Sequence, residues 1–139
     1  MSQKTLVTYS SLTGNTKKVA ESLGKALNVK TKEINSSANI EETDILFLGC
    51  GIYAGNVHKE VKEFIEKINP QKVKKIVLFS TSASGKDQLQ ALKDKINECG
   101  INLEERTFCC KGKAMMFLNR SNPDTSDLNE AVKFAKTFI

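Results

Sequence analysis

The chain has 139 residues, of which 40% are hydrophobic and 27% charged, and its formal net charge is +5 at pH 7. This length and composition predict a single globular domain spanning residues 1–139 and exclude a disordered chain. No run approaches the ~20 apolar residues of a membrane span, and residues 1–4 lead straight into the first predicted strand, so we expect a cytoplasmic protein without a signal peptide or membrane span.

Apolar runs of strand length alternate along the whole chain with segments of helical spacing. Strands are predicted at residues 4–9, 29–34, 44–49, 75–80 and 102–110. Helices are predicted at residues 15–27, 57–68, 86–99 and 126–138, and the polar linker 35–37 is expected to be a loop or one helical turn. This order is typical of a doubly wound α/β fold, in which a five-stranded parallel sheet carries helices on both faces.

A short polar loop separates the first strand from the first helix. It consists of Ser11, Leu12, Thr13, Gly14, Asn15 and Thr16. The start of a helix leaves backbone N–H groups unpaired and carries about +0.5 of dipole charge, so a phosphate group bound there is stabilised by both. The hydroxyl and amide side chains add neutral donors, and glycine lets the backbone approach closely. The loop therefore predicts a phosphate site, with a simple helix cap as the alternative.

The same loop resembles the FMN phosphate loop of the flavodoxins, whose pattern is Thr/Ser-x-Thr-Gly-x-Thr. Ser11, Thr13, Gly14 and Thr16 match that pattern, and Asn15 stands at a position that is often Asn in the family. The resemblance implies the flavodoxin-like strand order 2-1-3-4-5, FMN as the cofactor, and a site beyond the carboxyl ends of the strands. No insertion is apparent in the last strand, so the chain resembles the short-chain members.

The resemblance also implies which loops contact the flavin ring. The loop after the third strand would contribute Gly51, Ile52, Tyr53, Ala54 and Gly55. The loop after the fourth strand would contribute Thr81, Ser82, Ala83 and Gly85. Tyr53 offers a flat aromatic face for stacking, with packing on its own loop as the alternative. The second of these loops lacks the aromatic residue that is common in flavodoxins, and Met115 or Phe117 could cover that side of the ring instead.

The loops expected at this edge of the sheet have an unusual charge. They comprise residues 10–16, 50–58, 80–86 and 110–120, and they contain no Asp or Glu. Their titratable basic side chains are His58, Lys86, Lys111, Lys113 and Arg120. Nearby cations favour the ionised form of a group, whereas acidic flavodoxins place carboxylates near the anionic, fully reduced flavin. We therefore expect a less negative second-electron potential than in acidic flavodoxins, unless solvent screens these charges.

The leading interpretation is an FMN-binding electron-transfer protein that carries electrons between a reductase and an acceptor enzyme. The basic residues are spread along every predicted helix without interleaved aromatic residues, so a nucleic acid partner is not expected and an acidic protein is favoured. An alternative from another class of protein is a module that binds phosphate or a nucleotide without redox chemistry.

The nearer alternative to the leading interpretation is an FMN-dependent oxidoreductase acting on a quinone or an anionic tetrapyrrole. Two looser resemblances favour it. The segment from Gly51 to His58 is similar to a loop of menaquinone-dependent protoporphyrinogen oxidases, whose long inserted loop this chain lacks. Residues 110–113 and 119–120 are similar to the flavodoxin-like partner of bilirubin reductase. An anionic small molecule could then bind at the basic rim, the edge that carries His58, Lys86, Lys111, Lys113 and Arg120.

The cysteines and the histidine are expected to have structural roles. The four cysteines show no metal-ligand spacing, so we expect reduced thiols and no metal. Only Cys50, at the end of the third predicted strand, has a position that suits a thiol role. His58 is expected to cap the following helix or to lie on the surface, and no catalytic residue is assigned.

Overall fold

The computed structural model describes residues 3–12, 14–34, 40–53, 56–112 and 123–139. The elements follow in the order β1 (Thr5–Ser10), α1 (Asn15–Leu27), β2 (Thr31–Glu33), β3 (Ile45–Tyr53), β4 (Asn56–Val57), α2 (Lys59–Lys67), β5 (Ile76–Ser82), α3 (Gln90–Glu98), β6 (Phe108–Lys111) and α4 (Thr125–Lys136). The predicted linker at residues 35–37 lies outside the described residues.

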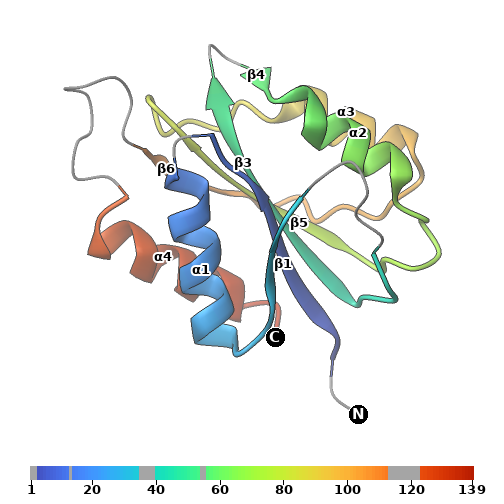
Figure 1. Ribbon diagram of the computed structural model, residues 1–139, viewed down its shortest axis with the longest axis horizontal. Coiled ribbons are helices and arrows are strands. Elements are labelled where there is room, and N and C mark those ends of the chain that lie inside the picture. Colours follow the sequence, from blue (N-terminus) through green and yellow to red (C-terminus); the bar gives the residue numbers. More distant parts are fainter. Residues whose placement is uncertain (1–2, 13, 35–39, 54–55, 113–122) are drawn as a thin grey trace.

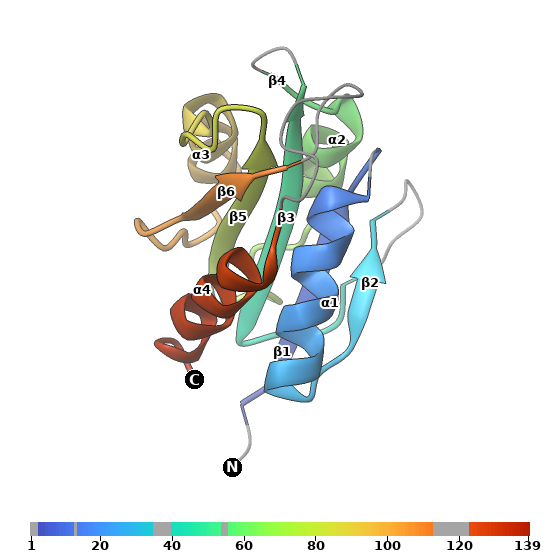
Figure 2. The ribbon, with the colours of Figure 1, turned by 90° about the vertical axis from the view of Figure 1, so that its left-hand side faces the viewer.

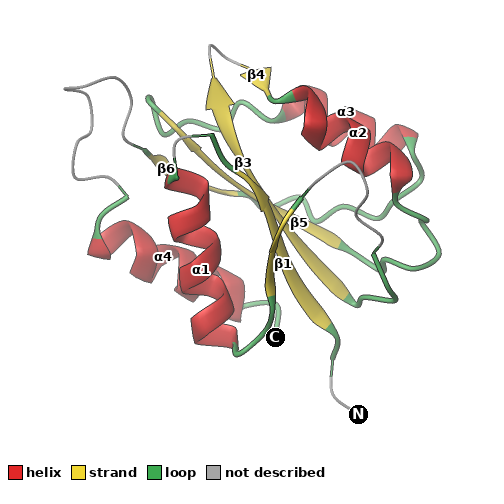
Figure 3. Ribbon diagram, in the orientation of Figure 1, coloured by secondary structure: helices red, strands yellow, loops and turns green. Residues whose placement is uncertain are grey.

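The sheet has the topology that was predicted. Its strands are ordered β2-β1-β3-β5-β6 (Figure 2; strands are yellow in Figure 3), and all neighbouring pairs on this path are parallel. The two-residue strand β4 lies off the path and pairs antiparallel with the end of β3. Without β4 the order is 2-1-3-4-5, which confirms the doubly wound flavodoxin-like arrangement.

Helices cover both faces of the sheet. α1 and α4 pack together on one face, and α2 and α3 pack together on the other (Figures 1 and 2). β3 and β5 are buried on both sides along nearly their whole length, because each reads as a continuous run of apolar and small residues. α1 buries Val19, Ala20 and Leu23, whose spacing places them on one helical face. In the part of the chain that is described, no helix combines the length and apolar character needed to cross a membrane.

The third strand is longer than expected and continues into a hairpin. The sequence pattern predicts that this strand ends at Gly49 and that residues 50–58 form a loop, whereas β3 runs on to Tyr53. Ile52 pairs with Val57 and Tyr53 with Asn56 in the β3–β4 hairpin. Backbone pairing therefore fixes the position of residues 51–53 at the edge of the sheet.

Two other predicted boundaries were wrong for identifiable reasons. The helix expected from residue 86 begins at Gln90, because the Asp87 carboxylate accepts hydrogen bonds from the Leu89 N–H (3.0 Å) and from Lys93 Nζ (2.8 Å) and so holds a turn. The last strand is divided: Leu103 bridges to Ile76, and regular pairing resumes only at Phe108 opposite Phe79. The intervening segment bulges out of the sheet.

Candidate functional site

The polar loop at residues 11–16 links β1 directly to α1 at the carboxyl edge of the sheet (Figure 1). Gly14 is the N-cap of α1, with a left-handed φ of 89°, and it gives the helix no side-chain cap. The Gly14 N–H donates to Ser11 Oγ at 2.9 Å. A Cβ atom added at Gly14 would meet no atom of the described residues within 4 Å. Thr13 lies outside the described residues.

Tyr53 joins the β3–β4 hairpin to this loop. Its hydroxyl accepts a hydrogen bond from the Leu12 N–H at 2.9 Å. The hydroxyl end of the ring lies against Gly51, where any larger residue would collide with it. The structure therefore places Tyr53 and Gly51 beside the loop at 11–16, whereas the side chain of Ile52, which was also predicted, is buried in the core against α2. Ala54 and Gly55, the other predicted residues of this segment, lie outside the described residues.

A buried pair of hydroxyl groups connects α1 to the end of β5. Thr16 Oγ1 and Thr81 Oγ1 are 2.8 Å apart, and both side chains are buried. The segment after Thr81 is held by hydrogen bonds of the Gly85 N–H to Ser82 Oγ (2.9 Å) and of the Gly112 N–H to the Ser82 carbonyl (3.0 Å). Ala83 lies in this turn. Three predicted loops thus meet at the start of α1.

The end of β6 forms a further wall of this site, at the edge where residues 110–120 were expected, but its contact with the start of α1 was not predicted. A side chain at Gly112 would collide with the side chain of Asn15, the first residue of α1. A glycine between two lysines gives no pattern that would have identified this close approach. Four residues that were predicted to lie at this edge fall outside the described residues: Lys113, Met115, Phe117 and Arg120.

In the described loop segments of this edge the charged side chains are basic, whereas Asp87, which directly follows Lys86, lies close enough to raise the pKa of Cys50. The loop segments 10–12, 14–16, 50–53, 56–58, 80–86 and 110–112 contain His58, Lys86 and Lys111 but no Asp or Glu. The Lys111 side chain lies beside Gly85, so the segment containing Lys86 and the end of β6 are neighbours. His58 is the N-cap of α2, and its Nδ1 accepts the Glu60 N–H at 3.2 Å. This confirms the expected cap.

Cys50 is unsuited to a thiolate role. All four cysteines are free, and Cys50 is completely buried in β3. Burial, with smaller contributions from Cys109 and Asp87, raises the pKa of the Cys50 thiol from 9.0 to about 12. At neutral pH the thiol stays protonated and therefore a poor nucleophile.

The buried Cys50 thiol also predicts alkaline destabilisation. Because ionisation is disfavoured only in the folded protein, the stability from this thiol is complete below pH 9 and is lost as the pH rises toward 12. The slope from one thiol is at most about 1.4 kcal/mol per pH unit. Urea unfolding of Cys50→Ala between pH 8 and 11 should show a shallower loss than the wild-type protein. An equal slope would contradict the assignment. The loss that remains in the variant comes from the other groups whose pKa is raised, namely Cys110 (to about 12), Cys109, Tyr9 and Lys95.

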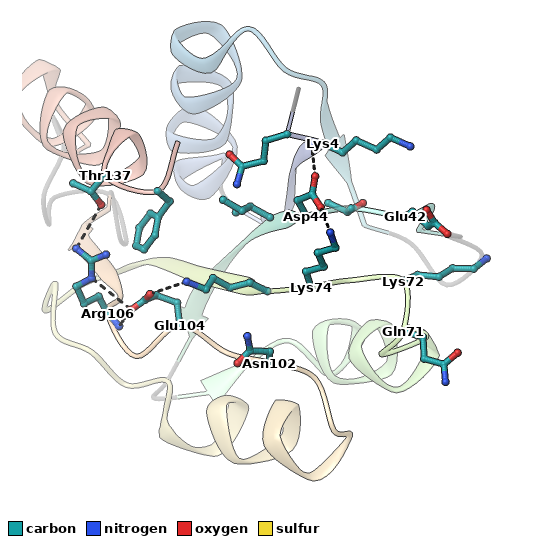
Figure 4. A pocket seen from close by; sticks show the side chains of 15 residues that line it. Lys4, Glu42, Asp44, Gln71, Lys72, Lys74, Asn102, Glu104, Arg106 and Thr137 are labelled. Carbon is teal, nitrogen blue, oxygen red and sulfur yellow. Dashed lines mark hydrogen bonds and ion pairs between the residues drawn. The ribbon is translucent and has the colours of Figure 1, made fainter. Parts of the chain in front are cut away.

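A separate cavity of about 1070 Å³ lies at the opposite, amino edge of the sheet (Figure 4). Two of the three carboxylates that line it, those of Asp44 and Glu104, form ion pairs. Asp44 accepts from the Lys4 backbone N–H (2.7 Å) and pairs with Lys74 (3.0 Å), and these contacts lower the pKa of Asp44. Glu104 pairs with Lys75 and Arg106. These ion pairs join neighbouring segments at the amino edge of the sheet.

No metal centre is found within the described ranges, where His, Cys, Asp and Glu never gather in a group of three or more suited to a metal ion. Neutral donors are instead concentrated at the carboxyl edge, around the start of α1. Such a donor set suits an anionic oxygen group.

Comparisons with known proteins match these features. A family profile described as "Flavodoxin domain" matches residues 6–121. A flavodoxin from Clostridium beijerinckii is 33% identical over 71% of this chain and 80% of its own length. The flavodoxin-like domain-containing protein BilS from Clostridioides difficile is 28% identical over 98% of this chain and 96% of its own length. The crystal structure of oxidised flavodoxin 2 from Bacillus cereus has a TM-score of 0.71 at 20% identity, covering 97% of each chain.

Proposed function

The chain belongs to the flavodoxin family, which binds FMN and transfers electrons, and from this premise we propose that it carries electrons between a reductase and an acceptor enzyme. The observation that carries the proposal is the meeting of three loops at the uncapped start of α1. When bound there, FMN supplies the redox chemistry, and the protein supplies binding and electrostatic tuning.

The donor set around α1 fits the phosphate group of FMN. The N–H groups of Leu12 and Gly14 each donate to a hydroxyl oxygen, so they point at positions where an acceptor oxygen binds. A Cβ atom added at Gly14 would touch none of the described residues, which agrees with space for a ligand beside this part of the backbone. In this proposal the phosphate is held by Ser11, Leu12, Thr13, Gly14, Asn15 and Thr16. The ring then contacts residues 51–55 and Thr81, Ser82, Ala83 and Gly85.

The proposal is tested by reducing the FMN-loaded protein stepwise without oxygen and by assaying it alone with quinones and NAD(P)H. A carrier is expected to take up electrons in two separate one-electron steps and to show no sustained turnover until a reductase and an acceptor are both added. Uptake of both electrons in one step, with turnover by the protein alone, would contradict the carrier function.

That second outcome would favour the alternative function, direct reduction of a quinone or of an anionic tetrapyrrole. The basic side chains at the carboxyl edge favour an anionic ligand in that case. In the carrier function they favour partners with acidic docking surfaces, because opposite charges speed association. The cytoplasmic location stays a prediction.

The basic rim should raise the second-electron potential. Removing two rim charges in the double variant Lys86→Gln/Lys111→Gln should lower this potential by about 20–50 mV, because each cation interacts weakly, through water, with the added negative charge. Spectroelectrochemical titration at low ionic strength gives the value. The matched control is Lys133→Gln, an exposed lysine of α4. Equal potentials for the double variant and the control would show that rim charge has no effect.

A further inference from the structure

The cavity at the amino edge of the sheet has a surplus of positive charge. Among the described residues that line it, three carry carboxylates and five carry cationic side chains, namely Lys4, Lys72, Lys74, Lys75 and Arg106. Its volume of about 1070 Å³ is comparable with the ~1,000 Å³ of the larger small-molecule sites of proteins. The cavity is therefore large enough for a small ligand, and its surplus of two positive charges favours an anionic one.

The backbone holds three of these lysines at the mouths of neighbouring strands. Lys4 directly precedes β1, and Lys72 and Lys74 precede β5. The Lys4 carbonyl accepts a hydrogen bond from the Asp44 N–H at 2.8 Å. The Thr43 N–H donates to the Lys72 carbonyl at 2.8 Å, and the Thr43 carbonyl accepts from the Lys74 N–H at 3.0 Å. The segment before β3 thus ties the other two segments together and fixes the spacing of their cations.

Two of the five cations take no part in the ion pairs described above. Lys74 pairs with Asp44, and Lys75 and Arg106 pair with Glu104. No ion pair between described residues engages the amino group of Lys4 or that of Lys72, and both side chains are exposed. In Figure 4 both amino groups extend away from the dashed interactions. Their charges are therefore available to a ligand.

Arg106 forms a cationic wall at another part of the cavity. Its guanidinium carbon lies 4.5 Å from the centroid of the Phe138 ring, and Lys75 Nζ lies 5.7 Å from the same centroid. Glu104 accepts from Lys75 Nζ at 3.2 Å and from Arg106 Nε at 3.4 Å. One carboxylate is thus shared by two cations. The guanidinium has five N–H donors, so donors that Glu104 does not use are left for an anionic oxygen.

We propose that the amino-edge cavity binds a polyphosphate group, either free or as part of a nucleotide. Phosphate oxygens suit both the forked donors of arginine and the point charges of lysine. A chain of phosphates carries several charges along its length, so it can contact Arg106 together with Lys4 and Lys72, whereas a single phosphate reaches fewer cations. The cavity lies at the edge opposite the proposed FMN site, so its ligand binds independently of the cofactor.

The probe for this site is tripolyphosphate, added to the FMN-loaded protein at constant ionic strength. Isothermal titration calorimetry gives the dissociation constant, and inorganic phosphate is the comparison. We expect tripolyphosphate to bind at least about 10-fold more tightly than phosphate, because it interacts with more cations at once. Amide shifts in ¹H–¹⁵N NMR should centre on residues 3–4, 71–75 and 102–106. Shifts centred on residues 11–16, or no binding of tripolyphosphate, would overturn the proposal without touching FMN binding.

The double variant Lys4→Gln/Lys72→Gln removes two charges and leaves the ion pairs of the cavity intact. It should bind tripolyphosphate about 10-fold more weakly than the wild-type protein. The matched control is Lys62→Gln/Lys133→Gln, which removes two exposed lysines of α2 and α4 outside the cavity and should weaken binding less than about 2-fold. Equal weakening in the two double variants would show general attraction to a basic protein and would overturn the proposal.

Adenosine triphosphate distinguishes the two sources of the polyphosphate group. If the ligand is a nucleotide, adenosine triphosphate should bind more tightly than tripolyphosphate, because its base can stack on the exposed Arg106 guanidinium. Arg106→Lys keeps the charge but removes the planar face, so it should abolish this difference. If the ligand is free polyphosphate, tripolyphosphate should bind at least as tightly as adenosine triphosphate. Weak binding of both, at the level of inorganic phosphate, would overturn the proposal.

Discussion

Gly14→Asp is expected to bind FMN about 100-fold more weakly than Gly14→Asn, because it places a carboxylate where the phosphate of FMN binds. Two negative groups about 5 Å apart at a partly exposed site repel by about 2–3 kcal/mol after screening. This is the largest effect on function that the structure predicts for one added charge. Fluorescence quenching of FMN gives both dissociation constants.

Position 14 allows this charge to be tested in isolation. A Cβ atom there meets no atom of the described residues within 4 Å, and Asn and Asp have the same shape and adopt the strained left-handed backbone found at Gly14 more readily than other side chains. The backbone cost is therefore shared by the two variants. A carboxylate at the N-terminus of a helix is favourable. The free energy of unfolding of FMN-free Gly14→Asp should therefore be no lower than that of Gly14→Asn, with an expected excess of about 0.3–1 kcal/mol.

If the site binds an anion, Gly14→Asp should be at least as stable as Gly14→Asn but should bind FMN more weakly. Loss of both in Gly14→Asp relative to Gly14→Asn would indicate damage to the loop. Equal FMN affinities for the two variants would contradict the placement of the phosphate at α1.

Gly49→Ala is expected to cause a large loss of stability, about 2–3 kcal/mol, because it overpacks the centre of the sheet. Gly49 of β3 lies opposite Phe79 of β5, and an added methyl group would collide with the Phe79 ring. Phe79 is buried in the core beneath α1 and α4, so its ring has nowhere to move. Urea unfolding should show a lower midpoint with an unchanged slope.

Relief of the same collision provides the control. In the double variant Gly49→Ala/Phe79→Leu the shorter side chain makes room for the methyl group, so the double variant should be more stable than the sum of the two single effects predicts. Additive losses, or a loss below about 0.5 kcal/mol for Gly49→Ala, would show that the close contact has no energetic consequence.

The features that could be predicted from the sequence are those that local chemistry determines. The first helix was placed at residues 15–27, as observed, because a glycine and small polar residues end the strand and apolar residues follow at helical spacing. β3 and β5 were recognisable as buried runs. The strand order came from the resemblance of the loop at 11–16 to that of flavodoxins.

The features that were missed depend on side-chain choices or on distant partners. Residues 86–89 fit a helical pattern, and only the capture of the Leu89 N–H by Asp87 shows that they form a turn. β4 has two residues and exists only because it pairs with the end of β3. Thr16 and Thr81 are 65 residues apart, and a single sequence does not indicate which hydroxyl groups meet. Contacts of this kind set the detailed shape of the candidate site.

FMN binding at the start of α1 is tested most directly by mapping the bound FMN with two-dimensional ¹H–¹⁵N NMR. Addition of FMN to the FMN-free protein should shift the amide signals of residues 11–16 most strongly, together with those of residues 51–55 and 81–85. Signals from the opposite edge, such as Lys4, Asp44 and Lys74 at the second cavity, should stay in place. Shifts centred on that amino-edge cavity, with residues 11–16 unaffected, would contradict FMN binding at the start of α1.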